Sequence, residues 1–168
     1  ILSSSNIEFS IDITDEEITT MADLGRLSIA VLNLVYNSCS YADLHPEISM
    51  LLKKQGNSYV ITVTDNGIGI KQDLLPYVFD PFFTDISKAG TESTGLGLTV
   101  TKEVAELHGG VCLITSEPYK GTTISIKCPI RDDLTKKCGL SVPPSPYLTR
   151  RMSLENIFLA EIGKYSAM

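Results

Sequence analysis

The sequence lacks any surplus of basic residues. Its 14 lysines and arginines stand against 20 aspartates and glutamates, which gives a formal net charge of −6. Nucleic acids are held largely by lysine and arginine on their phosphates, so a chain of this charge without a basic stripe is not expected to bind them. Long apolar runs are also missing, since stretches such as IAVL and MLL are far too short to cross a bilayer.

Cysteines spaced for a metal are absent as well. Cys39, Cys112, Cys128 and Cys138 include no CxxC pair, and such scatter is typical of reduced thiols in a cytosolic protein rather than of a metal site. No charged and then apolar leader is present. Because the chain begins with Ile1, we expect it to be part of a longer protein. We expect it in the cytoplasm, with any membrane segments outside this piece.

What the sequence does contain is enough apolar material for one domain: 168 residues, 43% of them hydrophobic and 20% charged. NIEFSIDI alternates and predicts a half-buried strand over residues 6–13. Between residues 23 and 42, apolar residues recur at helical spacing, which predicts an amphipathic helix of about five turns. The residues on its apolar side are Leu27, Val31, Leu34, Val35 and Ser38.

Turns and breaks predict the rest of the domain. EISMLLKK and SYVITVTD, joined by QGN, predict a hairpin over residues 47–65. KQDLLPYVFDPFF allows at most a short helix, because Pro76 and Pro81 interrupt it. Residues 84–94 are polar and aperiodic, which is typical of a mobile loop. A second helix is predicted over residues 95–110, and two antiparallel strands follow it.

These elements predict an α/β (α+β) sandwich, in which a mixed, mostly antiparallel sheet of about five strands packs against about three helices. A doubly wound sheet is not expected, since tight hairpins leave too few crossover helices. We expect the domain to cover residues 1–130. Residues 131–150 resemble a linker, and residues 151–168 could form an amphipathic helix capped by Ser153.

The first stretch with candidate chemistry is VTDNGIGI, residues 63–70. Asp65 ends a predicted buried strand, where its carboxylate can accept a directional hydrogen bond from an amino group such as that of adenine. Gly67 and Gly69 allow a sharp turn and let a flat ligand approach. A DNG turn with no ligand explains this octapeptide equally well.

The second stretch is a pair of asparagines in the first predicted helix. Asn33 and Asn37 are four residues apart, so they lie on one face of that helix. Amides on an apolar helix are costly to bury without partners, and an amide oxygen is a suitable ligand for Mg²⁺. Capping or core-bonded asparagines are the alternative.

The third stretch is STGLGL, residues 93–98, which opens the second predicted helix. Unpaired N–H groups and the helix dipole make such an end an anion site, and glycines allow phosphates close contact. The stretch lacks the lysine and the serine or threonine of a P-loop, and it is not GxGxxG. Neither of those two nucleotide motifs therefore applies.

In order and spacing, these motifs resemble the ATP-binding catalytic domain of sensor histidine kinases, within the superfamily of gyrase, heat-shock chaperone, histidine kinase and MutL ATPases. LNLVYNSCSYA resembles the asparagine box of that family, and DNGIGI its first glycine box. FDPFF resembles its phenylalanine box, TGLGLTVTKEVAELHGG its second glycine box with the following helix, and GTTISIKCPI its closing strand. The resemblance covers about residues 6–130 and implies the Bergerat fold.

The resemblance implies the role of each site residue. Asn37 would be the catalytic residue that holds Mg²⁺ against the phosphates, with support from Asn33, and Asp65 would bind the adenine amine. Gly95 and Gly97 would cradle phosphates, and residues 79–94 would form a lid. The residues placed at ATP by the resemblance are Asn33, Asn37, Tyr41, Asp65, Gly67, Gly69, Phe82, Phe83, Thr94, Gly95, Leu96, Gly97, Leu98 and Thr123.

One position departs from the family pattern. A basic residue often precedes the family tyrosine, and here Ser40 precedes Tyr41. That removes a phosphate contact, for which Lys88 or Lys71 could compensate. The alternative function of a module that binds nucleotide without catalysis therefore remains open.

Two catalytic relatives of the same superfamily fit the sequence less well. The gyrase and MutL type activates water with a glutamate one helical turn before the magnesium asparagine. Here that position is Asn33, and an amide cannot act as a general base. An anti-sigma-type serine kinase shares the fold, but the phenylalanine box is harder to assign in it.

The function implied by the resemblance is transfer of the γ-phosphoryl group of Mg-ATP to a histidine, in two-component signalling. His45 and His108 are not expected to be the acceptor, because neither lies in a His-acidic dipeptide on a dimerising helix. We expect the acceptor in a dimerisation domain upstream of Ile1. A response regulator would be the downstream partner.

Overall fold

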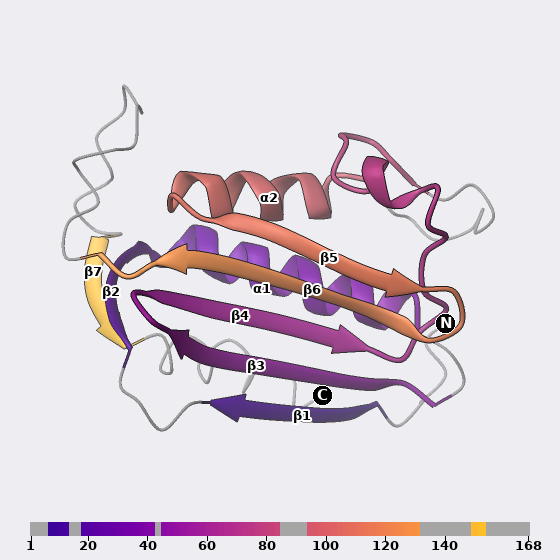
Figure 1. Cartoon of the computed structure of the whole chain (residues 1–168), viewed down its shortest axis with the longest axis horizontal. Helices are drawn as coiled ribbons and strands as arrows, with labels where there is room; N and C mark the ends of the chain where they lie inside the picture. The colour runs from indigo at the N-terminus through magenta and orange to yellow at the C-terminus, as the bar shows by residue number, and fades with distance from the viewer. Residues whose placement is uncertain (1–6, 14–17, 43–44, 85–93, 132–148, 154–168) are drawn as a thin grey trace.

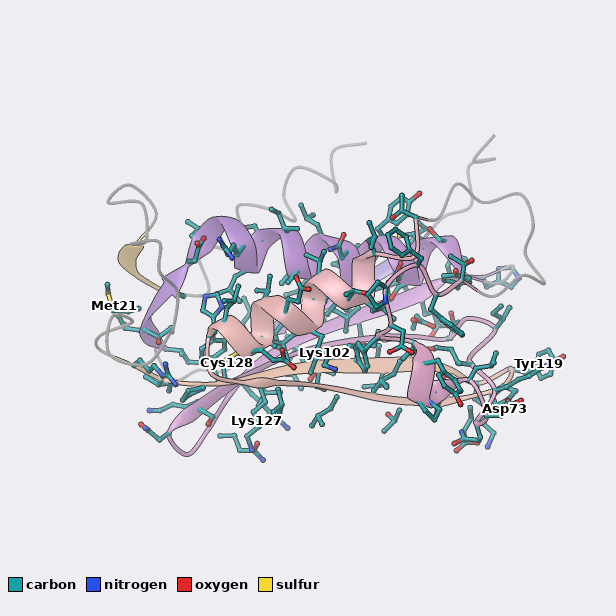
Figure 2. All side chains as sticks on the ribbon, turned by 90° about the horizontal axis from the view of Figure 1, so that it is seen from above. Met21, Asp73, Lys102, Tyr119, Lys127 and Cys128 are labelled. Carbon is teal, nitrogen blue, oxygen red and sulfur yellow. The ribbon has the colours of Figure 1, made fainter. Side chains whose placement is uncertain are left out.

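A computed structural model of the protein describes residues 7–13, 18–42, 45–84 and 94–131, together with the backbone of residues 149–153. In this part of the chain, five strands form one sheet with two α-helices on the same face (Figures 1 and 2). In order across the sheet, the strands are β1 (Glu8–Ile13), β3 (Glu47–Gln55), β4 (Ser58–Asp65), β6 (Gly121–Pro129) and β5 (Val111–Glu117). The predicted α/β sandwich is confirmed. Of the three expected helices, one is only a 3₁₀ turn, η1 (Leu75–Tyr77).

Hairpins and one crossover explain why the sheet is mixed. β3 pairs antiparallel with β4, β4 with β6, and β6 with β5. β1 runs parallel to β3, and the connection between them carries helix α1 (Leu24–Ser40), because parallel neighbours need a long crossover. The prediction of a mixed, mostly antiparallel sheet is therefore confirmed.

The face of the sheet that meets the helices carries the core. Successive side chains of a strand point to opposite faces, and the alternate residues of β3 on the helix side are at most 1% exposed. These residues are Ile48, Met50 and Leu52. The other face carries polar pairs, among them the hydroxyl groups of Thr64 and Thr123, 3.0 Å apart.

Helix α1 is amphipathic as predicted and is capped by Asp23, whose side chain accepts the backbone N–H of Arg26 at 3.0 Å. Its buried residues are Leu27, Ala30, Val31, Leu34 and Ser38, while Val35 is only partly buried. Helix α2 (Gly97–Leu107) packs on α1 through Thr101, whose hydroxyl lies 3.4 Å from the Ala30 carbonyl oxygen. Both helices therefore bury one side and leave the other to solvent.

His108 joins the end of α2 to the start of α1. Its Nε2 accepts the backbone N–H of Asp23 at 3.0 Å, so the ring is neutral and its Nδ1–H donates to the Val104 carbonyl oxygen at 2.8 Å. Burial lowers the pKa of His108. His45, by contrast, is exposed, as expected for a loop residue.

A second, two-stranded sheet lies at one end of the molecule (Figure 1). β2 (Thr19–Asp23), which the sequence patterns did not predict, pairs antiparallel with β7 (Thr149–Ser153). The helix expected over residues 151–168 is therefore wrong for residues 151–153, because their backbone pairs with β2. Residues 132–148 of the expected linker and residues 154–168 of the expected helix lie outside the described part.

Two expectations from composition concern thiols and membranes. Cys39, Cys112 and Cys128 are free thiols, and Cys138 lies outside the described residues. Among the helices of the described ranges, none has the length and apolar content that crossing a membrane would take.

Candidate functional site

A pocket opens where the C-terminal half of α1, the end of β4 and the start of α2 meet. Leu74 lines it, and its neighbour Asp73 lies at the end of the molecule away from Met21 of β2 (Figure 2). Of the residues predicted at the site, it is lined by Asn37, Tyr41, Asp65, Gly69, Phe83, Gly95, Gly97 and Leu98. The structure therefore gathers residues from four separate motifs around one space.

Apolar side chains form the walls between these polar groups. They come from the segment after β4, from η1 and its neighbours, and from β6, and they are Ile68, Ile70, Leu74, Val78 and Ile124. The ring of Phe83 joins them and stacks on Tyr77 with centroids 6.5 Å apart. Mostly apolar walls with a few convergent polar groups suit a flat organic ligand.

Asp65 supplies the most defined polar contact in the pocket. Its Oδ1 accepts the backbone N–H groups of Gly67 at 3.0 Å and Thr122 at 3.2 Å, and its Oδ2 accepts the hydroxyl of Ser38 at 3.0 Å. A carboxylate has about four acceptor positions, so these three bonds leave roughly one, on Oδ2. The pKa of Asp65 is nonetheless raised, because burial outweighs the donors.

Thr123 was predicted to lie at the adenine, but its side chain is on the opposite face of the sheet from the pocket. Its hydroxyl pairs with Thr64 on the outer side of the sheet, whereas its neighbour Thr122 lines the pocket and contacts Asp65. Adjacent residues of a strand point to opposite faces. Because the sequence reads Thr-Thr here, only the register of β6 on β4 distinguishes the two.

Ser38, Thr122 and Ser116 were all missed by the sequence reasoning. Ser38 follows Asn37 directly on the buried side of α1, and its apolar position in the helical pattern hid its polar role. Ser116 is 7% exposed, and its hydroxyl bonds three partners near the site. A serine at the last-but-one position of a strand carries no local signal that could have identified it.

Gly67 and Gly69 make room for protein backbone rather than for a ligand. A Cβ at Gly67 would strike the carbonyl oxygen of Tyr41, and a Cβ at Gly69 would strike that of Glu117. Gly69 also has a φ of 66°, which side chains disfavour. These glycines let the segment after Asp65 pack between α1 and the β5–β6 turn, and this packing fixes the carboxylate.

Gly97 differs from those two glycines. A Cβ there would meet its nearest neighbours, atoms of Asn33 and Asn37, at 3.7 Å, which is ordinary contact distance. The fold therefore does not require a glycine at this position. Asn33 does not line the pocket itself, but this contact puts it beside Asn37 and the first residue of α2.

The N-terminus of α2 is left open toward the pocket. Its N-cap, Leu96, makes no side-chain hydrogen bond to the helix, so no capping side chain at that position competes with an anion for the first N–H groups. Gly97 and Leu98 of the first turn line the pocket. Asn37 and this helix end therefore form a second polar corner of the pocket that Asp65 lines, suited to phosphates.

The two ends of the predicted lid lie together. The backbone N–H of Phe82 donates to the Gly95 carbonyl oxygen at 3.0 Å, and a Cβ at Gly95 would lie 2.6 Å from the Phe82 carbonyl carbon. Phe82 has a φ of 64° and is 74% exposed, so it does not line the pocket. Thr94 is exposed beside it, and residues 85–93, with Lys88, lie outside the described part.

The donor set fits a magnesium ion that is held mainly by a nucleotide. In the described ranges, no three His, Cys, Asp or Glu side chains gather as a metal cage. The amide of Asn37 lies beside the open helix end, and Mg²⁺ commonly takes one or two protein ligands with phosphates and waters. Asn37 could hold the ion in this way.

Comparison with known proteins gives the family context. The family model for histidine kinase-, DNA gyrase B- and HSP90-like ATPases matches residues 22–132. The sensor histidine kinase ZraS of Escherichia coli K12 is 39% identical over 116 residues, which are 69% of this chain and 24% of that protein. The sensor-like histidine kinase SenX3 of Mycolicibacterium smegmatis is 38% identical over 112 residues, 65% of this chain and 29% of that protein.

Solved structures agree in fold. A mycobacterial sensor histidine kinase, MprB, superposes with a TM-score of 0.66 at 29% identity, covering 76% of this chain and 86% of that one. The chain spans about a quarter of the length of the curated relatives it matches.

Proposed function

Because the chain belongs to the histidine kinase-, DNA gyrase B- and HSP90-like ATPase family, as an ATP-binding catalytic domain of the sensor histidine kinase kind, we propose how its pocket works. The pocket binds Mg-ATP, and the bound ATP donates its γ-phosphoryl group to a histidine on another domain of the same protein. That domain is the dimerisation domain expected upstream of Ile1, and a response regulator is the downstream partner. The domain acts in the cytoplasm.

One observation carries this proposal: the carboxylate of Asp65 and the amide of Asn37 line the same pocket. Asp65 keeps an acceptor position for the amine of adenine between apolar walls. At the other end, Asn37 lies beside the open N-terminus of α2. A ligand with a flat amine-bearing base and an anionic chain satisfies both ends at once.

Each residue then has a task in the transfer. Asp65 and Thr122 bind the base and so set the position of the phosphate chain. The N–H groups at Gly97 and Leu98 would hold phosphate oxygens, and Asn37 would hold Mg²⁺, which would supply neutralisation of the phosphate charge. Phosphoryl transfer depends mostly on positioning and electrostatic stabilisation. The acceptor imidazole needs no strong base if it arrives neutral, because one ring nitrogen then has a free lone pair to attack with.

Hydrolysis as the main activity is disfavoured by Asn33. It stands one helical turn before Asn37 and lies near Gly97 without lining the pocket, and an amide at this position cannot activate water as a base. A module that binds ATP only to regulate a partner is the second candidate, favoured by Ser40 in place of a basic residue. Phosphotransfer distinguishes it from a kinase.

The test is transfer of labelled γ-phosphate from ATP to the acceptor helices of the same full-length protein, supplied as a separate dimer. We expect labelled histidine with the wild-type chain and Mg²⁺, and little with Asn37→Ala. Without the acceptor helices, we expect little free phosphate. Binding of ATP without any transfer would support the regulatory module instead.

A further inference from the structure

Ser116 completes a row of polar side chains that crosses three strands. Asp65 of β4 is the direct partner of Thr122 on β6, and Thr122 is the direct partner of Ser116 on β5. Directly paired residues place their side chains on the same face of a sheet. The row therefore runs along the helix side of the sheet, from Asp65 in the pocket to the buried Ser116.

The bonds of Ser116 fix the direction of every hydroxyl hydrogen in this row. A serine hydroxyl has one hydrogen to donate and two lone pairs to accept with. The hydrogen of Ser116 goes to the Gly121 carbonyl oxygen at 2.8 Å, and one lone pair accepts the Ile70 N–H at 2.8 Å. The hydroxyl of Thr122 lies 2.9 Å away, and it must be the donor, since Ser116 has no hydrogen left.

The hydrogen of Thr122 therefore points away from the pocket. Its oxygen can only accept from a ligand, and the hydroxyl hydrogen of Ser38 is likewise directed at Asp65. Beside Asp65, the hydroxyl groups of Ser38 and Thr122 therefore offer a ligand lone pairs and no hydrogen.

We propose that Ser116, through Thr122, is a positioning residue that determines which nucleobase the pocket accepts. An acceptor-only wall favours a base edge with an amine, as in adenine, and repels the carbonyl that hypoxanthine and guanine carry at that position. The proposal rests on the proposed function, because it concerns the base of the same nucleotide.

The test compares the affinities of ATP and inosine triphosphate (ITP) for the 168-residue chain, by calorimetric titration with Mg²⁺. In Ser116→Ala, the hydroxyl of Thr122 is released and can turn its hydrogen toward the pocket. We expect the preference for ATP over ITP to fall about tenfold, the size of one hydrogen bond at about 1.4 kcal/mol. If Ser116 only supported the fold, both affinities would fall by the same factor.

Two control variants separate the hydroxyl from general damage. Ser125→Ala removes another serine hydroxyl of the sheet, paired with Thr62 on the outer face at 2.9 Å, and should leave the preference unchanged. In a Thr122→Val background, Ser116→Ala should no longer change the preference, because no threonine hydroxyl is left to turn.

Thr122→Val alone keeps the test decisive even if Ser116→Ala fails to fold. It removes an acceptor, so it should weaken ATP more than ITP; the opposite order would overturn the proposal. A wild-type chain that binds neither nucleotide would count against the proposed function. A chain that prefers ATP equally well with and without the Ser116 hydroxyl would count against this inference alone.

Discussion

The substitution Gly97→Ala separates the demands of the ligand from those of the fold. The added Cβ would lie 3.7 Å from Asn33 and Asn37, so nothing in the protein has to move. Gly97 is the first residue of α2, and alanine restricts the unfolded chain more than glycine does. The free energy of unfolding should therefore stay the same or rise by up to about 1 kcal/mol.

ATP binding should respond in the opposite direction. The new methyl group lies at the corner where the phosphates are proposed to approach the helix end. Overfilling a packed contact costs about 1–3 kcal/mol, which corresponds to roughly 5-fold to 150-fold weaker binding at about 1.4 kcal/mol per tenfold. Calorimetric titration with an ATP analogue gives the affinity, and denaturant unfolding gives the stability.

Gly69→Ala is the matched control for this substitution. Gly69 has a φ of 66°, and a Cβ there would strike the Glu117 carbonyl oxygen. The left-handed conformation alone costs a non-glycine residue about 1–2 kcal/mol, so this variant should lose stability. Destabilisation by Gly97→Ala as large as that by Gly69→Ala, or an unchanged ATP affinity in Gly97→Ala, would show that Gly97 does not serve the ligand.

Three further predictions follow from the hydrogen bonds and the topology. Burial raises the pKa of Asp65 above its ordinary 3.8, and the adenine amine needs the ionised carboxylate as its acceptor. ATP affinity measured against pH should therefore weaken on the acid side, and it should weaken more in the wild type than in Asp65→Asn. Burial lowers the pKa of His108 below its ordinary 6.5, so the unfolded chain binds this proton more readily. The free energy of unfolding should then fall as the pH drops below about 6.5, and His108→Gln should remove that dependence in denaturant titrations. Truncation after Leu148 removes β7 and exposes the edge of β2, which should lower the melting temperature. ATP affinity should not change, because β2 and the pocket lie at opposite ends of the molecule. An unchanged melting temperature would show that the β2–β7 pairing contributes nothing to stability.

Much of the sheet and both α-helices could be predicted because their signals are local. The spacing of Asn33 and Asn37 places both amides on one side of α1, and the position of Asp65 at the end of β4 needs only the strand pattern. β2 was missed because its strand is five residues long and runs directly into the helix. Its partner β7 lies more than a hundred residues away, and no local pattern reveals such a pairing.

The site was harder to predict where its chemistry depends on register. Thr122 and Thr123 are the same residue type, and only the pairing of β6 with β4 decides which one reaches Asp65. The glycines after Asp65 were expected to make space for a ligand. Their backbones instead pack against Tyr41 and Glu117, residues whose proximity only the folded chain reveals.

The most direct test of the account is a calorimetric titration of the wild-type chain with a non-hydrolysable ATP analogue in Mg²⁺, beside Asn37→Ala and Asp65→Asn. We expect the wild type to bind and each substitution to weaken binding by about 1–3 kcal/mol, the cost of removing a partner from a charged or buried polar group. Absence of binding by the wild type, or equal affinity in all three proteins, would contradict it.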